Sequence, residues 1–286
     1  MLSRQRAVLR LLENEGGAAS RLRLVKLAFL LSQEVRAPKT GVYEFLPYLR
    51  GPFSFTLYHD LRTLVRDGWV VEAEQSIKVS QPPNTETTLI ERSFRDMIDG
   101  VSERYSDMPT PTLVDRVYAS HPWFTMNSES VQKRSVTRPV ATPAVYTVGY
   151  EGIMVDGLLN LLLQSGIQRL IDVRSNPIAR RYGFHKSTLK QLCEDVDVEY
   201  MHVPSLGIPS AWRADLDDAT SYQRLFLRYE QEILPAQQPS VANVAYLLAE
   251  KPSALMCMEA DHTLCHRSRL AAMVSNQTAL QIRELR

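Results

Sequence analysis

The sequence is poor in cysteine and has little net charge of either sign. Its three cysteines, Cys193, Cys257 and Cys265, are spread over 286 residues. An odd number leaves one thiol outside any pairing, and a chain of this length does not need disulfides, so reduced thiols are expected. The 33 basic and 32 acidic residues give a net charge of +1. Overall charge therefore excludes a global attraction to nucleic acid or membrane, and any basic surface must be local.

Long apolar runs and internal repeats are also absent. No run approaches the roughly 18 residues of a membrane span, and the segment Met1–Arg6 becomes amphipathic before a signal-peptide core forms. We therefore expect a cytoplasmic protein with no membrane partner. The composition, 44% hydrophobic and 23% charged, is typical of globular proteins. The length favours two compact domains joined by a linker.

Residues 1–80 contain three helical patterns and two strand patterns. Apolar residues recur at helical spacing over Gln5–Glu13, Ser20–Pro38 and Ser54–Gly68, with Ser54 as the predicted N-cap. Trp69–Val71 and Ile77–Val79 then predict a β-hairpin. Together they predict a smaller, mainly α, winged-helix-like N-terminal domain.

The partner of this domain is open between DNA and protein. A winged helix binds DNA by inserting a helix into the major groove while basic side chains neutralise phosphates. Here Arg62 and Arg66 share the third helix with Asp60 and Asp67, and the hairpin carries more acidic than basic residues. The charges leave both alternatives in place.

A set of motifs in this domain resembles a known family. The motifs are Leu24-Val25-Lys26-Leu27, then Tyr43, Phe45 and Tyr48, then Gly51-Pro52-Phe53-Ser54 and the run Leu61–Gly68. They resemble the Panacea domain family, which is phage-associated and antitoxin-like. The resemblance implies binding of a partner, such as neutralisation of a toxin. The three spaced aromatic residues also fit an ordinary core, which their residue types favour.

Residues 81–143 predict packing helices followed by a linker. Ile90–Tyr105 and Leu113–Tyr118 show helical stripes, separated by two prolines. Ser128–Pro143 is rich in Ser, Thr and Val and has no sustained period, which is typical of a linker.

From residue 144 to residue 286 strands and helices alternate. Strands are predicted at Val145–Val148, Arg169–Arg174, Glu199–Val203 and Ser253–Cys257, and helices at Leu158–Leu163, Ser187–Glu194, Tyr222–Ile233 and Val241–Leu248. Alternation of this kind predicts a Rossmann-like α/β domain with a mainly parallel sheet. Ligands of such domains bind beyond the carboxyl ends of the strands.

Polar residues gather at those strand ends. The groups are Gly149–Gly152, Asp172–Pro177, Cys257–Glu259 and Cys265-His266-Arg267, the last at the expected start of a helix. Free amides at a helix start and arginine side chains both bind anions. We expect four charged side chains to share one cleft: Asp172, Arg174, Glu259 and Arg267. The alternative is that the arginines form ion pairs that only hold loops.

These groups supply candidate roles. Asp172 or Glu259 is a candidate general acid or base. Cys265 is a candidate nucleophile, because a helix start beside His266 and Arg267 favours a thiolate; Cys257 is the second candidate, and a buried structural thiol is the alternative. The candidate ligand-binding residues are Tyr150, Arg174, Ser175, His266 and Arg267.

Zinc is a third alternative, since Cys257, His262, Cys265 and His266 supply suitable atoms. Their spacing departs from the usual paired motifs, and neighbouring side chains on a helix would point apart. We therefore expect no metal site, and no cofactor follows from the sequence.

The same groups resemble a second family, domain of unknown function 488. The motifs are Thr147-Val148-Gly149-Tyr150, Ile171-Asp172-Val173-Arg174-Ser175, Pro177, Phe184, Leu206-Gly207, Cys257, Glu259 and Cys265-His266-Arg267. They follow the family's order across nearly all of residues 145–275. The resemblance implies a fold but no particular reaction.

The sequence thus predicts a nucleotide- or nucleic-acid-related protein whose α/β domain binds or processes a phosphate-bearing ligand. The alternative is a non-enzymatic regulator, antitoxin-like or ligand-sensing. Any nucleic-acid contact is expected to be electrostatic and local, at a patch such as Arg180, Arg181 and Lys186.

Overall fold

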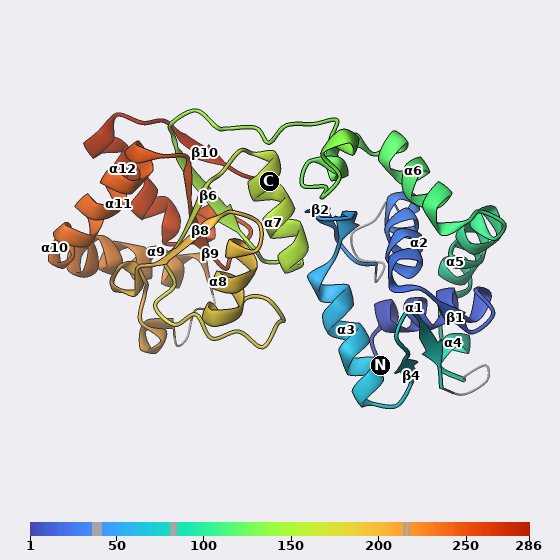
Figure 1. Cartoon of the computed structure of the whole chain (residues 1–286). Helices are drawn as coiled ribbons and strands as arrows, with labels where there is room; N and C mark the ends of the chain where they lie inside the picture. The colour runs from blue at the N-terminus through green and yellow to red at the C-terminus, as the bar shows by residue number, and fades with distance from the viewer. Residues whose placement is uncertain (36–41, 81–84, 214–215, 217) are drawn as a thin grey trace. The chain divides into compact units, whose positions relative to one another are not determined.

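The computed structural model describes residues 1–35, 42–80, 85–213, 216 and 218–286 (Figure 1). The chain forms two compact units, residues 1–137 and residues 138–286. The boundary between them falls inside the predicted linker Ser128–Pro143. The helices predicted between residues 81 and 143 belong to the first unit.

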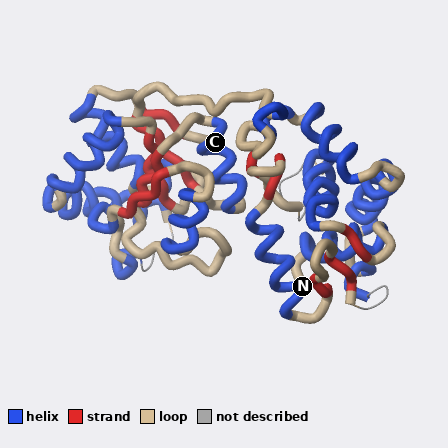
Figure 2. Tube along the Cα trace, in the orientation of Figure 1, coloured by secondary structure: helices blue, strands red, loops and turns tan. Residues whose placement is uncertain are grey.

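The first unit is mainly helical (Figure 2), and its described residues form two small antiparallel sheets. Its elements are α1 (Ser3–Asn14), β1 (Ala18–Ala19), α2 (Arg21–Glu34), β2 (Leu46–Tyr48), β3 (Gly51–Phe53), α3 (Phe55–Arg66), β4 (Val70–Glu72), β5 (Ile77–Val79), α4 (Thr85–Thr88), α5 (Arg92–Tyr105), α6 (Thr110–Ser120) and two 3₁₀ helices, Pro122–Thr125 and Val131–Lys133. One sheet has the order β1-β5-β4 and the other is the hairpin β2-β3. Helix α5 packs on α1 and α2.

The predicted helices and hairpin of this unit are confirmed. Ser20 and Ser54 are N-caps, accepting hydrogen bonds from the amides of Arg23 and Leu57. Gly68 follows α3 with a φ of 75°, a conformation that favours glycine and ends the helix. Pro38, where the second helix was expected to end, lies outside the described residues.

The second unit is an α/β structure around a five-stranded sheet in which every neighbouring pair is parallel. Its elements are β6 (Val145–Gly149), α7 (Val155–Gln164), β7 (Arg169–Asp172), α8 (Lys186–Glu194), β8 (Glu199–His202), the 3₁₀ helices Pro204–Leu206 and Ser210–Arg213, α9 (Ala219–Arg228), the π-helix Tyr229–Ile233, α10 (Leu234–Ala236), α11 (Gln238–Glu250), β9 (Ser253–Cys257), the 3₁₀ helix His262–Leu264, α12 (Arg267–Thr278) and β10 (Ile282–Glu284). The predicted parallel sheet is confirmed.

The strand order is β10-β6-β9-β7-β8. Strand β9 therefore lies between β6 and β7, whereas in the Rossmann order the first three strands are neighbours. The sheet is parallel, as predicted for a Rossmann-like domain, but its strand order differs from the Rossmann order. Helices α7 and α8 lie on one side of the sheet, and α11 and α12 lie on the other (Figure 1).

Alternation along the strands divides the core between these two sides. Ile171, Leu255 and Cys257 belong to a buried cluster with residues of α9, α11 and α12. Asp172 pairs with Met256, the residue before Cys257, and so points to the opposite face. Among the described residues, we find no helix with the length and apolar character needed to span a bilayer.

Candidate functional site

The carboxyl ends of β6, β7 and β9 meet at one edge of the sheet, but their polar side chains form two separate groups. Asp172 and Arg174 pair on the α7 and α8 side. Cys257 and Glu259 lie on the other side with Cys265 and His266. The expectation that Asp172, Arg174, Glu259 and Arg267 share one cleft is wrong, because neighbouring residues of a strand point to opposite faces.

The first group is a closed, buried network around Asp172. Its carboxylate accepts hydrogen bonds from the Arg174 Nε and Nη2 atoms at 2.8 and 2.6 Å and from the Tyr200 hydroxyl at 2.6 Å. The Arg174 Nη1 atom donates to the Tyr150 hydroxyl and to the Phe184 carbonyl. The arrangement is that of the alternative interpretation, in which Arg174 forms an ion pair that holds loops.

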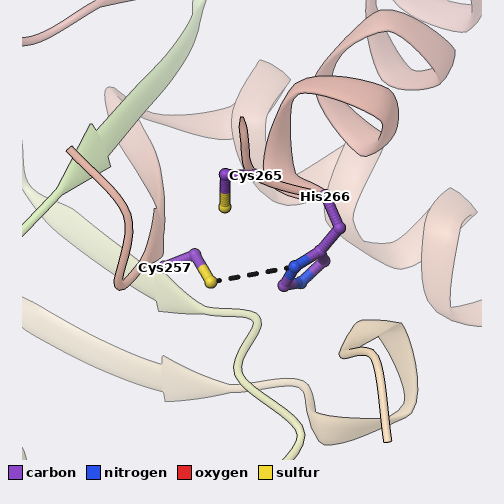
Figure 3. A group of neighbouring side chains, drawn as sticks. All are labelled: Cys257, Cys265 and His266. Carbon is purple, nitrogen blue, oxygen red and sulfur yellow. Dashed lines mark hydrogen bonds between the residues drawn. The ribbon is translucent and has the colours of Figure 1, made fainter. Parts of the chain in front are cut away.

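The second group is built from the end of β9 and the start of α12 (Figure 3). The sulfur of Cys257 lies 3.8 Å from Nδ1 of His266 and 3.2 Å from Oε2 of Glu259. Ligand atoms of Cys257, Cys265 and His266 all lie within 4.8 Å of one another. All three residues are 1% exposed. We call these three residues the Cys-His cluster.

Electrostatics separate the two thiols of this cluster. The hydrogen bond from Cys265 and the charge of His266 lower the pKa of Cys257 well below its usual range. Burial and the neighbouring Cys257 raise the pKa of Cys265. These effects oppose the thiolate expected at Cys265 and favour one at Cys257, the second candidate. Burial opposes charge on His266, but the interaction with Cys257 outweighs it and raises the pKa of the imidazole.

Helix α12 begins two residues later than the thiolate argument required. Cys265 is extended, with φ −131° and ψ 136°, and His266 is the N-cap. Because neither residue lies inside the helix, their adjacent side chains both reach Cys257. The expectation that the two would point apart is wrong for this reason.

A pocket of about 430 Å³ opens beside the cluster. Its polar lining comes from Arg213, Glu259 and His266; the apolar lining residues are Ile208, Leu216, Tyr222, Leu225, Phe226 and Leu264. An Nη1 atom of Arg213 donates to Oε1 of Glu259 at 3.0 Å. The exposed lining is mostly polar, and a small number of convergent polar groups in a concave pocket is typical of a ligand site.

Other predicted residues shape this region without lining the pocket. Arg267 is fully buried and donates to the backbone carbonyls of Glu259 and Ala260. Gly149 lies against the loop that follows β9. A Cβ at this position would lie 1.9 Å from the Glu259 carbonyl oxygen, so only glycine fits there. Ser175 is approached in the same way by Gly207, where a Cβ would lie 2.1 Å from the Ser175 amide nitrogen. His262 contacts Glu284 instead of the cluster, with its Nδ1 atom 3.1 Å from Oε1 of that carboxylate.

Sequence reasoning missed Arg213 and Tyr200. In the sequence, Arg213 ends a short 3₁₀ helix that is well separated from the predicted strand ends, and Tyr200 lies within β8. Neither residue therefore belongs to a motif at a strand end. A cation in an otherwise irregular segment before an amphipathic helix was the available signal for Arg213. Nothing in the sequence separates Tyr200 from an ordinary core tyrosine.

The comparison with family models found a match within the second unit. Residues 154–274 match the family model of a domain of unknown function, DUF488. The match covers most of the α/β unit and includes both halves of the Cys-His cluster, but not β6 or β10. Neither the curated proteins nor the solved structures contain a match to the chain.

Proposed function

We propose that the α/β unit, the part that contains the DUF488 match, binds and processes a small ligand with a phosphate or similar anionic group. The observation that carries this proposal is the placement of Arg213 in the pocket wall, joined to Glu259 and close to the Cys-His cluster. Pockets beyond the carboxyl ends of parallel strands are the usual ligand sites of α/β folds.

The charge around the pocket supports an anionic ligand. Arg213 offers a guanidinium, which forms bidentate bonds with phosphate oxygens. His266 is the N-cap of α12, so the positive end of that helix adds to the field there. When the ligand binds, Arg213 gives up its hydrogen bond to Glu259 and bonds to the ligand instead. The released Glu259 carboxylate then becomes available for proton transfer.

For the first unit we propose a winged-helix-like module that binds a protein. The order α1-β1-α2-α3-β4-β5, interrupted between α2 and α3 by the hairpin β2-β3, and the sheet of β1, β5 and β4 support this assignment. Its exposed charges are mixed: Arg66 on α3 pairs with Asp67, and Arg21 pairs with Glu72 on β4. A DNA-binding surface needs uncompensated basic residues, so the pattern favours a protein partner.

Nucleic acid remains the less favoured ligand of the second unit. Within the basic patch considered for it, Arg181 donates to the carbonyls of Tyr150 and Ile153 and thereby holds a loop. Arg180 and Lys186 are exposed, and two cations give a weak electrostatic site.

The test is ligand binding by variants of the full chain. Isothermal titration with inorganic phosphate and a panel of nucleoside monophosphates should find a saturable ligand. Arg213→Gln should weaken its binding by about tenfold or more, because a hydrogen bond to a charged group contributes about 1.5–3 kcal/mol. Glu259→Gln should retain binding but lose any turnover of that ligand.

Lys190→Gln is the control, since it removes one positive charge from an exposed pair with Glu194 on α8. Binding that is equal in Arg213→Gln and Lys190→Gln would overturn the proposal. Binding without turnover of any probe would favour the regulator alternative.

A further inference from the structure

The Cys-His cluster has the composition and shape of a metal site. Two sulfurs and one imidazole nitrogen form the ligand set that zinc prefers. In a tetrahedral site with Zn–S of about 2.3 Å and Zn–N of about 2.0 Å, the sulfur and nitrogen lie about 3.5 Å apart. Cys257 Sγ and His266 Nδ1 lie 3.8 Å apart, which is close to that spacing.

The orientation of His266 is fixed by its other ring nitrogen. Nε2 lies 3.2 Å from the carbonyl oxygen of Val173 and can only donate to it. In the neutral imidazole that bond places the proton on Nε2, so the Nδ1 atom, 3.8 Å from the Cys257 sulfur, is the one that would bind a metal ion. Metal-binding histidines are held in this way by a carbonyl or carboxylate behind the ring.

The surrounding structure holds the two halves of the cluster together. Cys257 ends a central strand of the sheet, and Cys265 and His266 lead into α12, which packs on β9 and β6. Arg267 fixes the intervening loop through two carbonyls. The three side chains converge from these two elements in Figure 3.

We propose that Cys257, Cys265 and His266 bind one thiophilic divalent metal ion, zinc in the first instance. Three protein ligands leave a fourth position, as in catalytic rather than structural zinc sites. His266 and Glu259 line the pocket, so that position faces the ligand proposed above. Glu259 Oε2 lies 3.2 Å from the Cys257 sulfur, so this carboxylate would be available as a proton acceptor beside the metal. Metal binding itself does not depend on the proposed function.

The experiment measures metal in the full chain, purified under reducing conditions without a metal-affinity step. Elemental analysis should find about one zinc per chain after growth with zinc. The chain stripped by a chelator should bind one Co²⁺, with thiolate-to-cobalt charge-transfer absorption and the visible bands of tetrahedral cobalt. Cys257→Ser, Cys265→Ser and His266→Gln should each weaken Zn²⁺ binding by about tenfold or more in competition with a chromophoric chelator.

Two control variants keep the same residue types. Cys193→Ser changes a buried thiol on α8, and His262→Gln changes the histidine that contacts Glu284. Both should bind metal as the unmodified chain does. Measuring metal with no phosphate or nucleotide present separates this test from that of the proposed function. If a cluster variant does not fold, the cobalt spectrum of the unmodified chain still decides the question.

A folded, reduced chain that shows no thiolate-to-cobalt absorption would overturn the proposal. Metal bound equally by the cluster variants and the controls would also overturn it. A disulfide between Cys257 and Cys265 that persists in reductant would replace the metal site by a redox pair.

Discussion

At the scale of single residues, the buried ion pair between Asp172 and Arg174 should be costly to break. The Asp172 carboxylate is fully buried and receives three side-chain hydrogen bonds from Arg174 and Tyr200. Breaking a buried pair leaves an uncompensated charge, at a cost of about 3–5 kcal/mol. The pair therefore matters for folding even if it never touches a ligand.

We predict that Asp172→Asn lowers the free energy of unfolding of the α/β unit by about 3–5 kcal/mol, because the Arg174 charge stays buried without its partner. Hydrogen exchange of the β7 amides measures this free energy separately from that of the first unit. Asp195→Asn, at an exposed position after α8, is the control and should change it by less than about 0.5 kcal/mol. A loss below about 1 kcal/mol in Asp172→Asn would contradict the assigned role.

The residue types of the site could be predicted from sequence, but not how they are grouped. Position at a strand end correctly indicated that Asp172, Glu259 and Cys257 lie near one edge of the sheet. Which face each side chain takes depends on where the strand ends and on its register with β9. The same limit applied to Cys265, where two residues of difference in the helix start changed what its side chain reaches.

At the scale of elements, α2 buries a lysine against the β2-β3 hairpin. Lys26 is 1% exposed, and its ammonium donates to the carbonyls of Arg50 and Pro52. Burial lowers the pKa of Lys26 to about 7. Gly51 between those carbonyls has a φ of 85°, and a Cβ there would meet the Tyr118 ring at 2.4 Å. The Gly-Pro-Phe-Ser motif thus shapes the acceptor loop for this lysine.

We predict that the first unit becomes more stable as pH rises from about 7 toward 10. In that range the unfolded chain protonates Lys26 and the folded chain does not, so the unfolded state binds more protons. The slope is at most about 1.4 kcal/mol per pH unit and vanishes below pH 7, where both states are protonated.

Guanidinium unfolding followed by circular dichroism at pH 7, 8 and 9 checks this, with Lys26→Met expected to lose the slope. Lys78→Met replaces an exposed lysine on β5 and should keep it. Parallel pH profiles for the two variants would show that Lys26 is not the titrating group.

Most helices and strands were predictable because their apolar periodicity is local. β10 was not, because Ile282–Glu284 is a short segment with one apolar residue that becomes a strand only by pairing with β6. The insertion of β9 between β6 and β7 likewise depends on contacts between distant segments, which periodicity does not record.

At the scale of the whole molecule, each unit has its own core, so the second should fold when it is made alone. The family match stops short of its complete sheet, since residues 154–274 exclude β6 and β10. Strand β6 pairs with β9 and packs against α12. Without β6, the fully buried strand β9 would become an exposed edge.

We predict that residues 138–286 fold, as a monomer or a stable oligomer, and unfold in one cooperative transition. Residues 154–274 should aggregate or remain unfolded. Circular dichroism and size-exclusion chromatography of the two fragments compare them directly. Both contain Cys257, Cys265 and His266, so the loss in the shorter fragment must come from the missing strands rather than from a missing side chain of the cluster. Equal folding of the two fragments would mean that β9 and α12 do not need β6. The pairing of β6 with β9 would then not be required to hold the Cys-His cluster together.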